Sequence, residues 1–179
     1  MHKNLPKLFY FISEFEKNEI NNLNKNIAII YRNYLTNHDE KKISEIKKFC
    51  KSTNRKFFLS NNIKLALKLN LDGAYIPSFN KELKINLFSR KKNFIILGSA
   101  HNLNEIRIKE KQGVKAIFLS PIFRVKKKTK ELGIYKFINL TKLSNRKIIA
   151  LGGINKYNLK RAMKLAIHGF AGISYFKKV

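Results

Sequence analysis

Two adjacent glycines near the C-terminal end of the chain have the composition of an anion-binding turn. Gly152 and Gly153 follow the apolar run 147–151 and precede a pattern of helical spacing over 155–167. Because glycine has no Cβ, the backbone N–H groups of such a turn can approach a ligand closely. Asn155 can cap the following helix, and a helix N-terminus also stabilises an anion. The turn therefore suggests a phosphate site, although a tight turn alone would explain a single Gly-Gly pair.

A histidine occupies a second position where chemistry is expected. His101 follows the apolar run 93–98 and the small residues Ser99 and Ala100. The pKa of histidine lies near neutrality, so its ring suits proton transfer. A lone histidine can equally be structural or solvated. The other three histidines have no comparable context, and their pattern resembles no metal site; they are His2, His38 and His168.

Short apolar runs alternate with helical patterns along the chain. Strands are expected over 7–12, 27–31, 56–60, 73–77, 93–98, 115–120, 147–151 and 169–174. Helices are expected up to about residue 24 and over 39–51, 62–70, 102–112, 134–143 and 155–167. The strands are almost continuously apolar, which indicates that both of their faces are covered, and the alternation with helices indicates parallel βα units.

Eight such units predict a small (β/α)8 barrel of the TIM type, with residues 1–179 forming a single domain. We expect the eighth helix to be missing or vestigial, because little chain follows the run 169–174. A doubly wound open sheet is the structural alternative. The region 78–91 and the basic loop 124–130 give no clear pattern of their own.

The order of the strands strengthens the phosphate prediction. In barrels of this type a phosphate commonly lies between the loops after strands seven and eight. The seventh run ends at the glycine pair, and the eighth ends at Gly172, Ile173 and Ser174. Two glycine-containing strand ends at these positions favour an anion site over tight turns alone.

Composition limits the choice of partner. The formal charge is +27, from 38 Lys and Arg against 11 Asp and Glu. The lysines are scattered over all the expected elements, with no basic arm and no aromatic–basic RNA-binding motif. We therefore expect only non-specific binding of nucleic acid, and a general attraction for phosphorylated small molecules. No run approaches the roughly 20 apolar residues of a membrane helix, and no signal peptide is evident. The chain is expected to be cytoplasmic, with Cys50 as a small buried residue.

The motifs together resemble those of the thiamine phosphate synthase / TenI family of (β/α)8 barrels. The segments "GSAHNLNEIRIKEKQGVKAIFLSPIF" and "ALGGINKYNLKRAMKLAIHGFAGIS" carry most of the resemblance. The family has a Ser-x-His turn after strand five, a loop of Gly-Pro-x-Phe type after strand six, a Gly-Gly-Ile turn and a final Gly-x-Ala strand. The matching residues are Ser99, His101, Glu105, Gly113, Pro121, Phe123, Gly152, Gly153, Ile154, Gly169 and Ala171.

This resemblance implies a thiamine biosynthesis protein that joins a thiazole phosphate to hydroxymethylpyrimidine pyrophosphate and releases pyrophosphate. It implies that the thiazole phosphate is held by Gly152, Gly153, Ile173 and Ser174. It makes Ser99 and His101 the candidate catalytic residues. Barrels of this family often pair, so a homodimer is one form that the resemblance implies.

The pyrophosphate half of the family pattern is altered in this chain. Arg32 matches the arginine of the family's Gln-x-Arg-x-Lys strand, but Ile30 and Tyr34 replace its neighbours. The two Mg²⁺-binding aspartates align with Asn61 and Asn80, so no protein metal ligand is predicted, and Mg²⁺ would accompany the pyrophosphate substrate. The basic loop offers further cations to the pyrophosphate, at Lys126, Lys128 and Lys130, or it is simply a solvated charge run.

These replacements leave two alternatives open. The TenI branch of the family is a thiazole tautomerase that needs no metal and uses the histidine of the Ser-x-His turn, matched by His101. The other alternative is a catalytically silent barrel that binds phosphate or nucleic acid through its positive charge.

Overall fold

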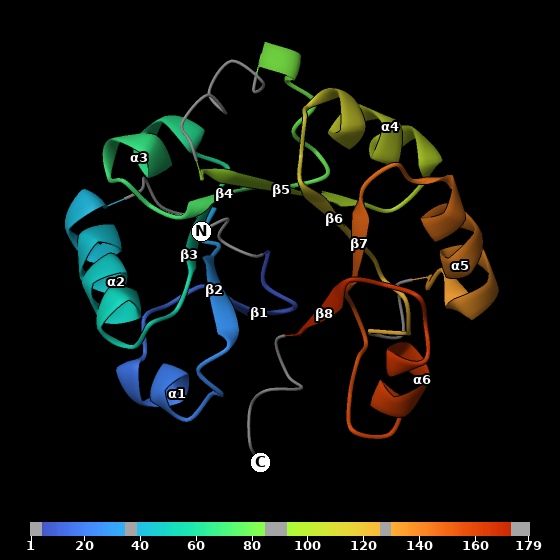
Figure 1. Ribbon diagram of the computed structural model, residues 1–179, viewed down its shortest axis with the longest axis horizontal. Helices are drawn as coiled ribbons and strands as arrows, with labels where there is room; N and C mark the ends of the chain where they lie inside the picture. Colours follow the sequence, from blue (N-terminus) through green and yellow to red (C-terminus); the bar gives the residue numbers. More distant parts are fainter. Residues whose placement is uncertain (1–4, 35–38, 85–92, 126–129, 173–179) are drawn as a thin grey trace.

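Eight parallel strands close into a barrel in the computed structural model, which describes residues 5–34, 39–84, 93–125 and 130–172 (Figure 1). The strands are β1 (Leu8–Ile12), β2 (Ile27–Tyr31), β3 (Phe57–Ser60), β4 (Gly73–Ile76), β5 (Ile95–Ala100), β6 (Ala116–Leu119), β7 (Lys147–Ala150) and β8 (Gly169–Gly172). The helices around them are α1 (Lys17–Asn21), α2 (Glu40–Ser52), α3 (Ile63–Lys68), α4 (Leu103–Lys111), α5 (Gly133–Leu143) and α6 (Leu159–Met163).

Pairing of the first and last strands closes the barrel. Phe9 of β1 lies opposite Ala171 of β8, and every other strand pairs in parallel with its neighbours in sequence. The (β/α)8 prediction is confirmed, and the open-sheet alternative is wrong. The predicted loss of the eighth helix falls on residues 173–179, outside the described part of the chain.

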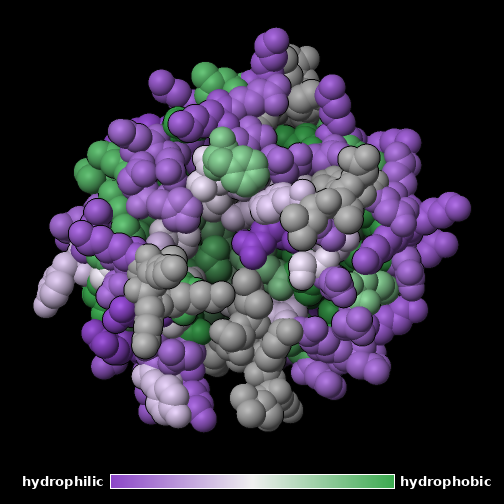
Figure 2. Space-filling view, turned by 180° about the vertical axis from the view of Figure 1, so that it is seen from behind, coloured by the Kyte–Doolittle hydropathy of each residue, from purple (hydrophilic) through white to green (hydrophobic). Residues whose placement is uncertain are grey.

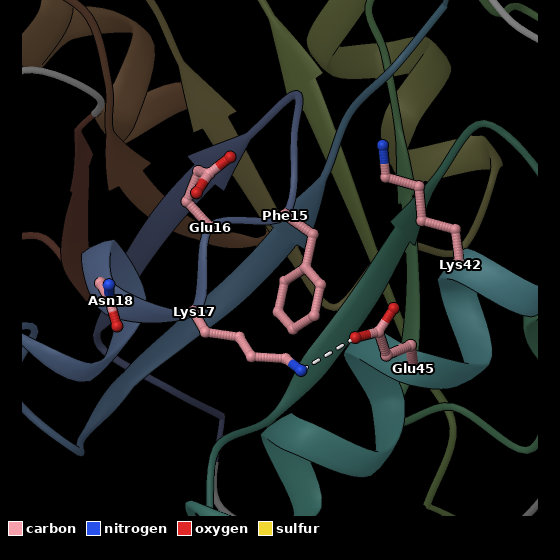
Figure 3. Close-up of a pocket in the computed structure, with 6 residues that line it drawn as sticks. All are labelled: Phe15, Glu16, Lys17, Asn18, Lys42 and Glu45. Atoms are coloured by element: carbon pink, nitrogen blue, oxygen red, sulfur yellow. Dashed lines mark ion pairs between the residues drawn. The ribbon is translucent and has the colours of Figure 1, made fainter.

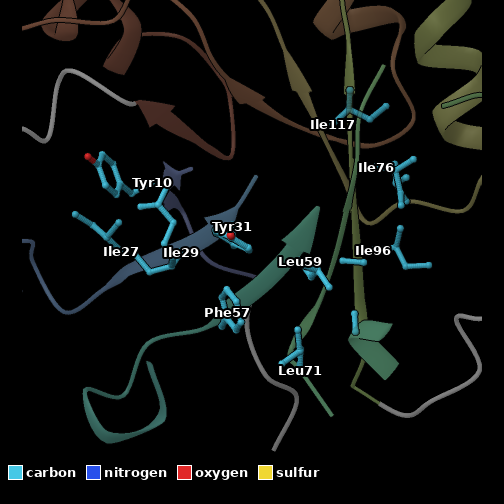
Figure 4. Packing of buried hydrophobic residues seen from close by; sticks show 14 of the residues in the cluster. Tyr10, Ile27, Ile29, Tyr31, Phe57, Leu59, Leu71, Ile76, Ile96 and Ile117 are labelled. Atoms are coloured by element: carbon cyan, nitrogen blue, oxygen red, sulfur yellow. The ribbon is translucent and has the colours of Figure 1, made fainter. Parts of the chain in front are cut away.

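Two apolar layers explain why the strands are almost continuously apolar. Residues that point away from the barrel axis form one buried cluster with apolar side chains of the helices. Figure 4 shows Tyr10, Ile29, Leu59 and Ile117 of this cluster. Cys50 of α2 belongs to this outer layer, as predicted, and burial raises the pKa of its thiol to about 12. Among the described residues, no helix is long and apolar enough to cross a membrane.

Aromatic rings fill the interior of the barrel. Phe9 contacts Phe118 and Phe58 at ring-centroid distances of 5.0 and 6.0 Å, and Phe11 contacts Phe118 at 5.6 Å. Such tilted and edge-to-face pairs are the favoured packing of aromatic rings. The interior is therefore a core rather than a pore, and a polar ligand must bind at the rim.

A buried arginine stabilises the N-terminal ends of the strands, opposite the expected site. Arg55 donates to the carbonyl oxygens of Asn24 and Leu23, both at 2.6 Å, and of Ile20 at 3.0 Å. Burial lowers the pKa of Arg55. These hydrogen bonds join the end of α1 to the segment before β2. All three acceptors are uncharged carbonyl groups.

We expect Arg55→Met to destabilise the fold by about 3 kcal/mol, because several buried carbonyl groups would lose their donor. Arg146→Met, which removes an exposed arginine, should have almost no effect. Thermal or denaturant unfolding of the two variants measures the difference. Equal stability of both variants would show that the Arg55 hydrogen bonds contribute nothing.

Candidate functional site

The last inward-facing positions of several strands are polar. Ser60, Ser99 and Ser120 continue the inward-facing series of β3, β5 and β6, and all three are buried. Arg32 does the same after β2, and its guanidinium carbon lies 5.0 Å from the ring of Phe11, a residue of the barrel interior. The apolar interior of the barrel is therefore covered by a layer of polar side chains at the end where such barrels bind ligands.

Ser99 lies in this layer beneath the rim. Its side chain hydrogen-bonds the hydroxyl of Tyr75, which is buried in the barrel. Burial raises the pKa of Tyr75 well above its usual value, so the phenol stays protonated at neutral pH. This contact makes Ser99 a residue of the polar layer, next to the predicted binding region.

His101 is held in one orientation directly after β5. Its Nδ1 lies 2.7 Å from the carbonyl oxygen of Ser120, and its Nε2 lies 3.1 Å from Oγ of Ser78. A carbonyl oxygen only accepts, so Nδ1 carries the proton and Nε2 is the basic nitrogen. The backbone N–H of His101 donates to Glu105 at 2.8 Å, which fixes the turn before α4. The ring is thus oriented as a general base requires.

The loop after β4 connects the ends of two other strands. The ring of Phe79 packs edge-on against Tyr34, with centroids 5.5 Å apart, and the Tyr34 hydroxyl lies 3.0 Å from Oγ of Ser60. Nδ2 of Asn80 donates to Oδ1 of Asn61 at 2.8 Å. Phe79 and Asn80 therefore join side chains from the ends of β2 and β3 into one group.

The predicted phosphate turn has a conformation that requires glycine. Gly152 and Gly153 have φ angles of 90° and 72°. A Cβ on Gly152 would lie 2.7 Å from Cβ of Pro121, and one on Gly153 would collide with the carbonyl of Phe123. The carbonyl of Gly153 accepts from Nδ2 of Asn158 at 2.8 Å, while neither glycine N–H donates to an acceptor in the described part of the chain. Two donors thus remain for an anion.

The helix after this turn begins later than predicted. Asn155 does not cap α6, since its side chain accepts from the N–H of Tyr157 at 2.9 Å and so closes a turn before the helix. The helix begins at Leu159, with Asn158 as its N-cap, and has only five residues. The predicted cap at Asn155 is therefore wrong, and the glycine N–H groups are the candidate donors of this site.

Known proteins resemble this chain over most of its length. Residues 23–176 match the family model described as thiamine monophosphate synthase. The chain belongs to the thiamine monophosphate synthase family. It is 26% identical over 133 residues to a thiamine-phosphate synthase of Methanococcus maripaludis, covering 73% of this chain and 64% of that relative. It is 32% identical over 153 residues to that of Prochlorococcus marinus subsp. pastoris, covering 83% of this chain and 43% of the relative.

A solved member shares the fold over most of both chains. The thiamine phosphate pyrophosphorylase from Pyrococcus furiosus superposes with a TM-score of 0.76 at 20% identity, covering 94% of this chain and 86% of that one. The chain nevertheless spans less than two thirds of the length of the two curated synthases above. A role in thiamine biosynthesis follows from membership of the family.

The family's Mg²⁺ ligands have no equivalent at the aligned positions. Asn61 and Asn80 lie side by side, but the amide of Asn80 donates to Asn61, so Oδ1 of Asn61 already has a partner. Amides also lack the negative charge that Mg²⁺ prefers in its protein ligands. The described residues contain no group of three or more His, Cys, Asp or Glu side chains that could hold a metal ion. These residues do not fit a protein-held magnesium ion.

Of the remaining predicted site residues, one lies in the described part of the chain. Lys130 is exposed, and two residues later the N–H of Leu132 donates to the carbonyl of Pro121 at 2.9 Å, so the loop returns to the end of β6. The other predicted residues lie outside the described part of the chain, namely Lys126, Lys128, Ile173 and Ser174.

A separate groove lies on the outside of the barrel (Figure 3). It is lined by Phe15, Glu16, Lys17, Asn18, Lys42 and Glu45. The Lys17–Glu45 ion pair crosses it at 3.0 Å, and both side chains are more than half exposed. An exposed pair of this kind contributes little free energy, and none of the predicted site residues lines the groove. It is not part of the candidate site.

Several contacts of the site were missed by sequence reasoning. Ser78 and Ser120 orient His101, and Tyr75 holds Ser99. Ser120 is the last inward-facing residue of its apolar run, and this position in the run was the available signal. Ser78 gave no such signal, because its contact with His101 depends on the path of a loop.

Proposed function

We propose that this protein is a thiamine phosphate synthase. It binds thiazole phosphate at Gly152 and Gly153 and joins the thiazole to hydroxymethylpyrimidine pyrophosphate, with release of pyrophosphate. The observation that supports this most strongly is the glycine turn, whose two N–H groups face no protein acceptor among the described residues and whose geometry excludes side chains. Backbone donors of this kind suit a phosphate.

Negative charge develops on the pyrophosphate as its bond to the pyrimidine carbon breaks. Arg32, at the mouth of the barrel, is placed to stabilise that charge, together with Lys130 and the other lysines of the basic loop. The amides of Asn61 and Asn80 can hydrogen-bond phosphate oxygens but cannot replace carboxylates. Any Mg²⁺ would therefore arrive bound to the pyrophosphate substrate.

A calorimetric titration tests the phosphate site directly. Thiazole phosphate should bind at least about a hundredfold more tightly than the matching thiazole alcohol, because each charge-assisted hydrogen bond contributes roughly 1.5–3 kcal/mol. Equal affinity for the two ligands would refute the site.

Thiazole tautomerisation is a second candidate function, supported by the orientation of His101. With Nδ1 donating to Ser120, the basic Nε2 and the hydroxyl of Ser78 form a pair that can move a proton at a bound thiazole. This reaction needs no metal, which suits the Asn61–Asn80 pair.

His101→Asn separates the two candidate functions. We expect tautomerisation to fall by about a hundredfold or more, since general base catalysis is typically worth 10²–10⁴-fold. Condensation should fall much less, because its main demand is stabilisation of the leaving pyrophosphate. Rates of both reactions in the same preparation are the measurement. Unchanged tautomerisation would exclude His101 as its base.

The distribution of charge favours small phosphorylated ligands. Hydrophilic side chains surround the face seen in Figure 2 on every side instead of forming one stripe. Exposed lysines also occur on well-separated elements, among them Lys17, Lys68, Lys142 and Lys160. A dispersed charge of this kind attracts anions generally and gives nucleic acid only a salt-sensitive, non-specific attachment.

A further inference from the structure

A fully buried lysine lies behind the loop that follows β4. Lys109 of α4 has no exposed surface, and its ammonium group donates three hydrogen bonds. The acceptors are the carbonyl oxygens of Pro77 at 2.8 Å and Asn80 at 2.7 Å, and Oε1 of Gln112 at 2.9 Å. Lysine is almost never fully buried unless its charge is paired, and here all three partners are uncharged.

The neighbouring residues provide hydrogen-bond partners and space for this buried side chain. Gln112 is also fully buried, and its Nε2 donates to the carbonyls of Asn80 and Glu82, both at 3.0 Å. On the other side, Gly98 of β5 leaves the space for the lysine stem, since a Cβ there would lie 2.8 Å from Cδ of Lys109. Lys109 of α4 and Gln112, the C-cap of that helix, thus donate hydrogen bonds to three carbonyl groups of loop 77–82.

The same loop presents side chains to the candidate site. Ser78 meets His101, and Asn80 meets Asn61. The Asn80 carbonyl accepts from the buried lysine while its amide group lies in the site. A shift of this loop would move these side chains together.

We propose that Lys109 is a positioning residue that fixes loop 77–82, so that its side chains form the pyrophosphate half of the site. The identity of the ligand, pyrophosphate, rests on the proposed function. The attachment of the loop by Lys109 is independent of that function. The glycine turn belongs to β7, so binding of thiazole phosphate should not depend on Lys109.

The strength of the attachment depends on pH. Burial lowers the pKa of Lys109 to about 8, and Glu105 on the same helix opposes that shift. The other surroundings are uncharged, since the loop presents carbonyls, β5 presents Gly98 and the segment before β6 presents Val114. Below about pH 8 the ammonium satisfies three acceptors. Because the pKa of Lys109 is lower in the closed loop than for an exposed lysine, the closed loop binds the proton less tightly than an open loop does. The free energy that favours the closed loop therefore increases as the pH rises above about 8.

Hydrogen exchange of the loop tests the attachment without any ligand. In Lys109→Met, which keeps the length of the side chain, amides of 78–84 should exchange about tenfold faster or more, because local opening becomes easier. Lys142→Met, at an exposed lysine of α5, is the matched control and should exchange like the unaltered protein. Gln112→Met, which removes two bonds to the loop, should resemble Lys109→Met and serves if the first variant does not fold. Unchanged exchange in the loop would overturn the proposal.

Titration with inorganic pyrophosphate tests the link to the site. Lys109→Met should bind pyrophosphate about tenfold more weakly at pH 7, while its affinity for thiazole phosphate stays within about twofold. Comparing the unaltered protein with Lys109→Met at the same pH cancels ionisation of the ligand. Unchanged pyrophosphate affinity in a variant with a loosened loop would contradict the positioning role.

These readouts separate failure of the proposal from failure of the proposed function. If the protein forms no thiamine phosphate but the loop and pyrophosphate results hold, the synthase assignment fails and the role of Lys109 stands. If thiamine phosphate forms equally well in Lys109→Met and in the control, the role of Lys109 fails and the synthase assignment stands.

Discussion

Gly153→Asp should abolish binding of thiazole phosphate. The new side chain would place a carboxylate where the phosphate is expected, and two like charges at 4 Å repel by about 4 kcal/mol in a partly buried setting, or roughly a thousandfold in affinity. It would also collide with the backbone carbonyl of Phe123 and force a residue with a Cβ into a left-handed conformation. Calorimetric titration with thiazole phosphate measures the loss.

Gly133→Asp is a matched control for this variant. Gly133 has a φ angle of 70°, against 72° for Gly153, but a Cβ there would meet nothing within 4 Å. The control therefore carries the same backbone strain and the same charge, without the collision. It should bind thiazole phosphate almost normally. Equal affinities of the two variants would mean that the anion binds elsewhere.

Replacing both site asparagines by aspartate should create a dependence on Mg²⁺. The unaltered protein offers a mutually bonded amide pair at Asn61 and Asn80, so we expect its condensation rate to change by no more than about twofold when free Mg²⁺ is chelated. In Asn61→Asp/Asn80→Asp, chelation should lower the rate by about a hundredfold. Two carboxylates repel the pyrophosphate unless a cation lies between them.

The control for this variant introduces the same two negative charges at the opposite end of the barrel. Asn26 and Asn145 are exposed and precede β2 and β7. Asn26→Asp/Asn145→Asp should behave like the unaltered protein in the presence and absence of Mg²⁺. If the control acquires the same dependence, the effect comes from net charge and not from a restored metal site.

The fold could be predicted from the sequence because its signals are local. Each strand is a short run that is apolar on both faces, and a count of eight such runs was enough to favour a barrel over an open sheet. The tight glycine turn was predicted in the same way, since Gly152 and Gly153 need no distant partner to be recognised. The position of His101 after β5 also followed from the chain order.

The contacts that hold the loop after β4 were not predictable in this way. The local sequence "IRIKEK" predicts that Lys109 is an exposed lysine. Its burial depends on the space left by Gly98 and on carbonyl groups of a loop about thirty residues earlier in the chain. Likewise, Asn155 has the residue type of a helix cap, but its side chain closes an earlier turn. Both depend on tertiary packing, which overrides local propensity.

The most direct measurement of the central claim is formation of thiamine phosphate by the purified protein. Thiazole phosphate and hydroxymethylpyrimidine pyrophosphate would be supplied together, in parallel reactions with Mg²⁺ and with a chelator, and the products followed by mass spectrometry. The account predicts thiamine phosphate and pyrophosphate in equal amounts, with or without added Mg²⁺, and neither product from Gly153→Asp. Absence of thiamine phosphate in both reactions, from a folded protein that binds thiazole phosphate, would contradict it.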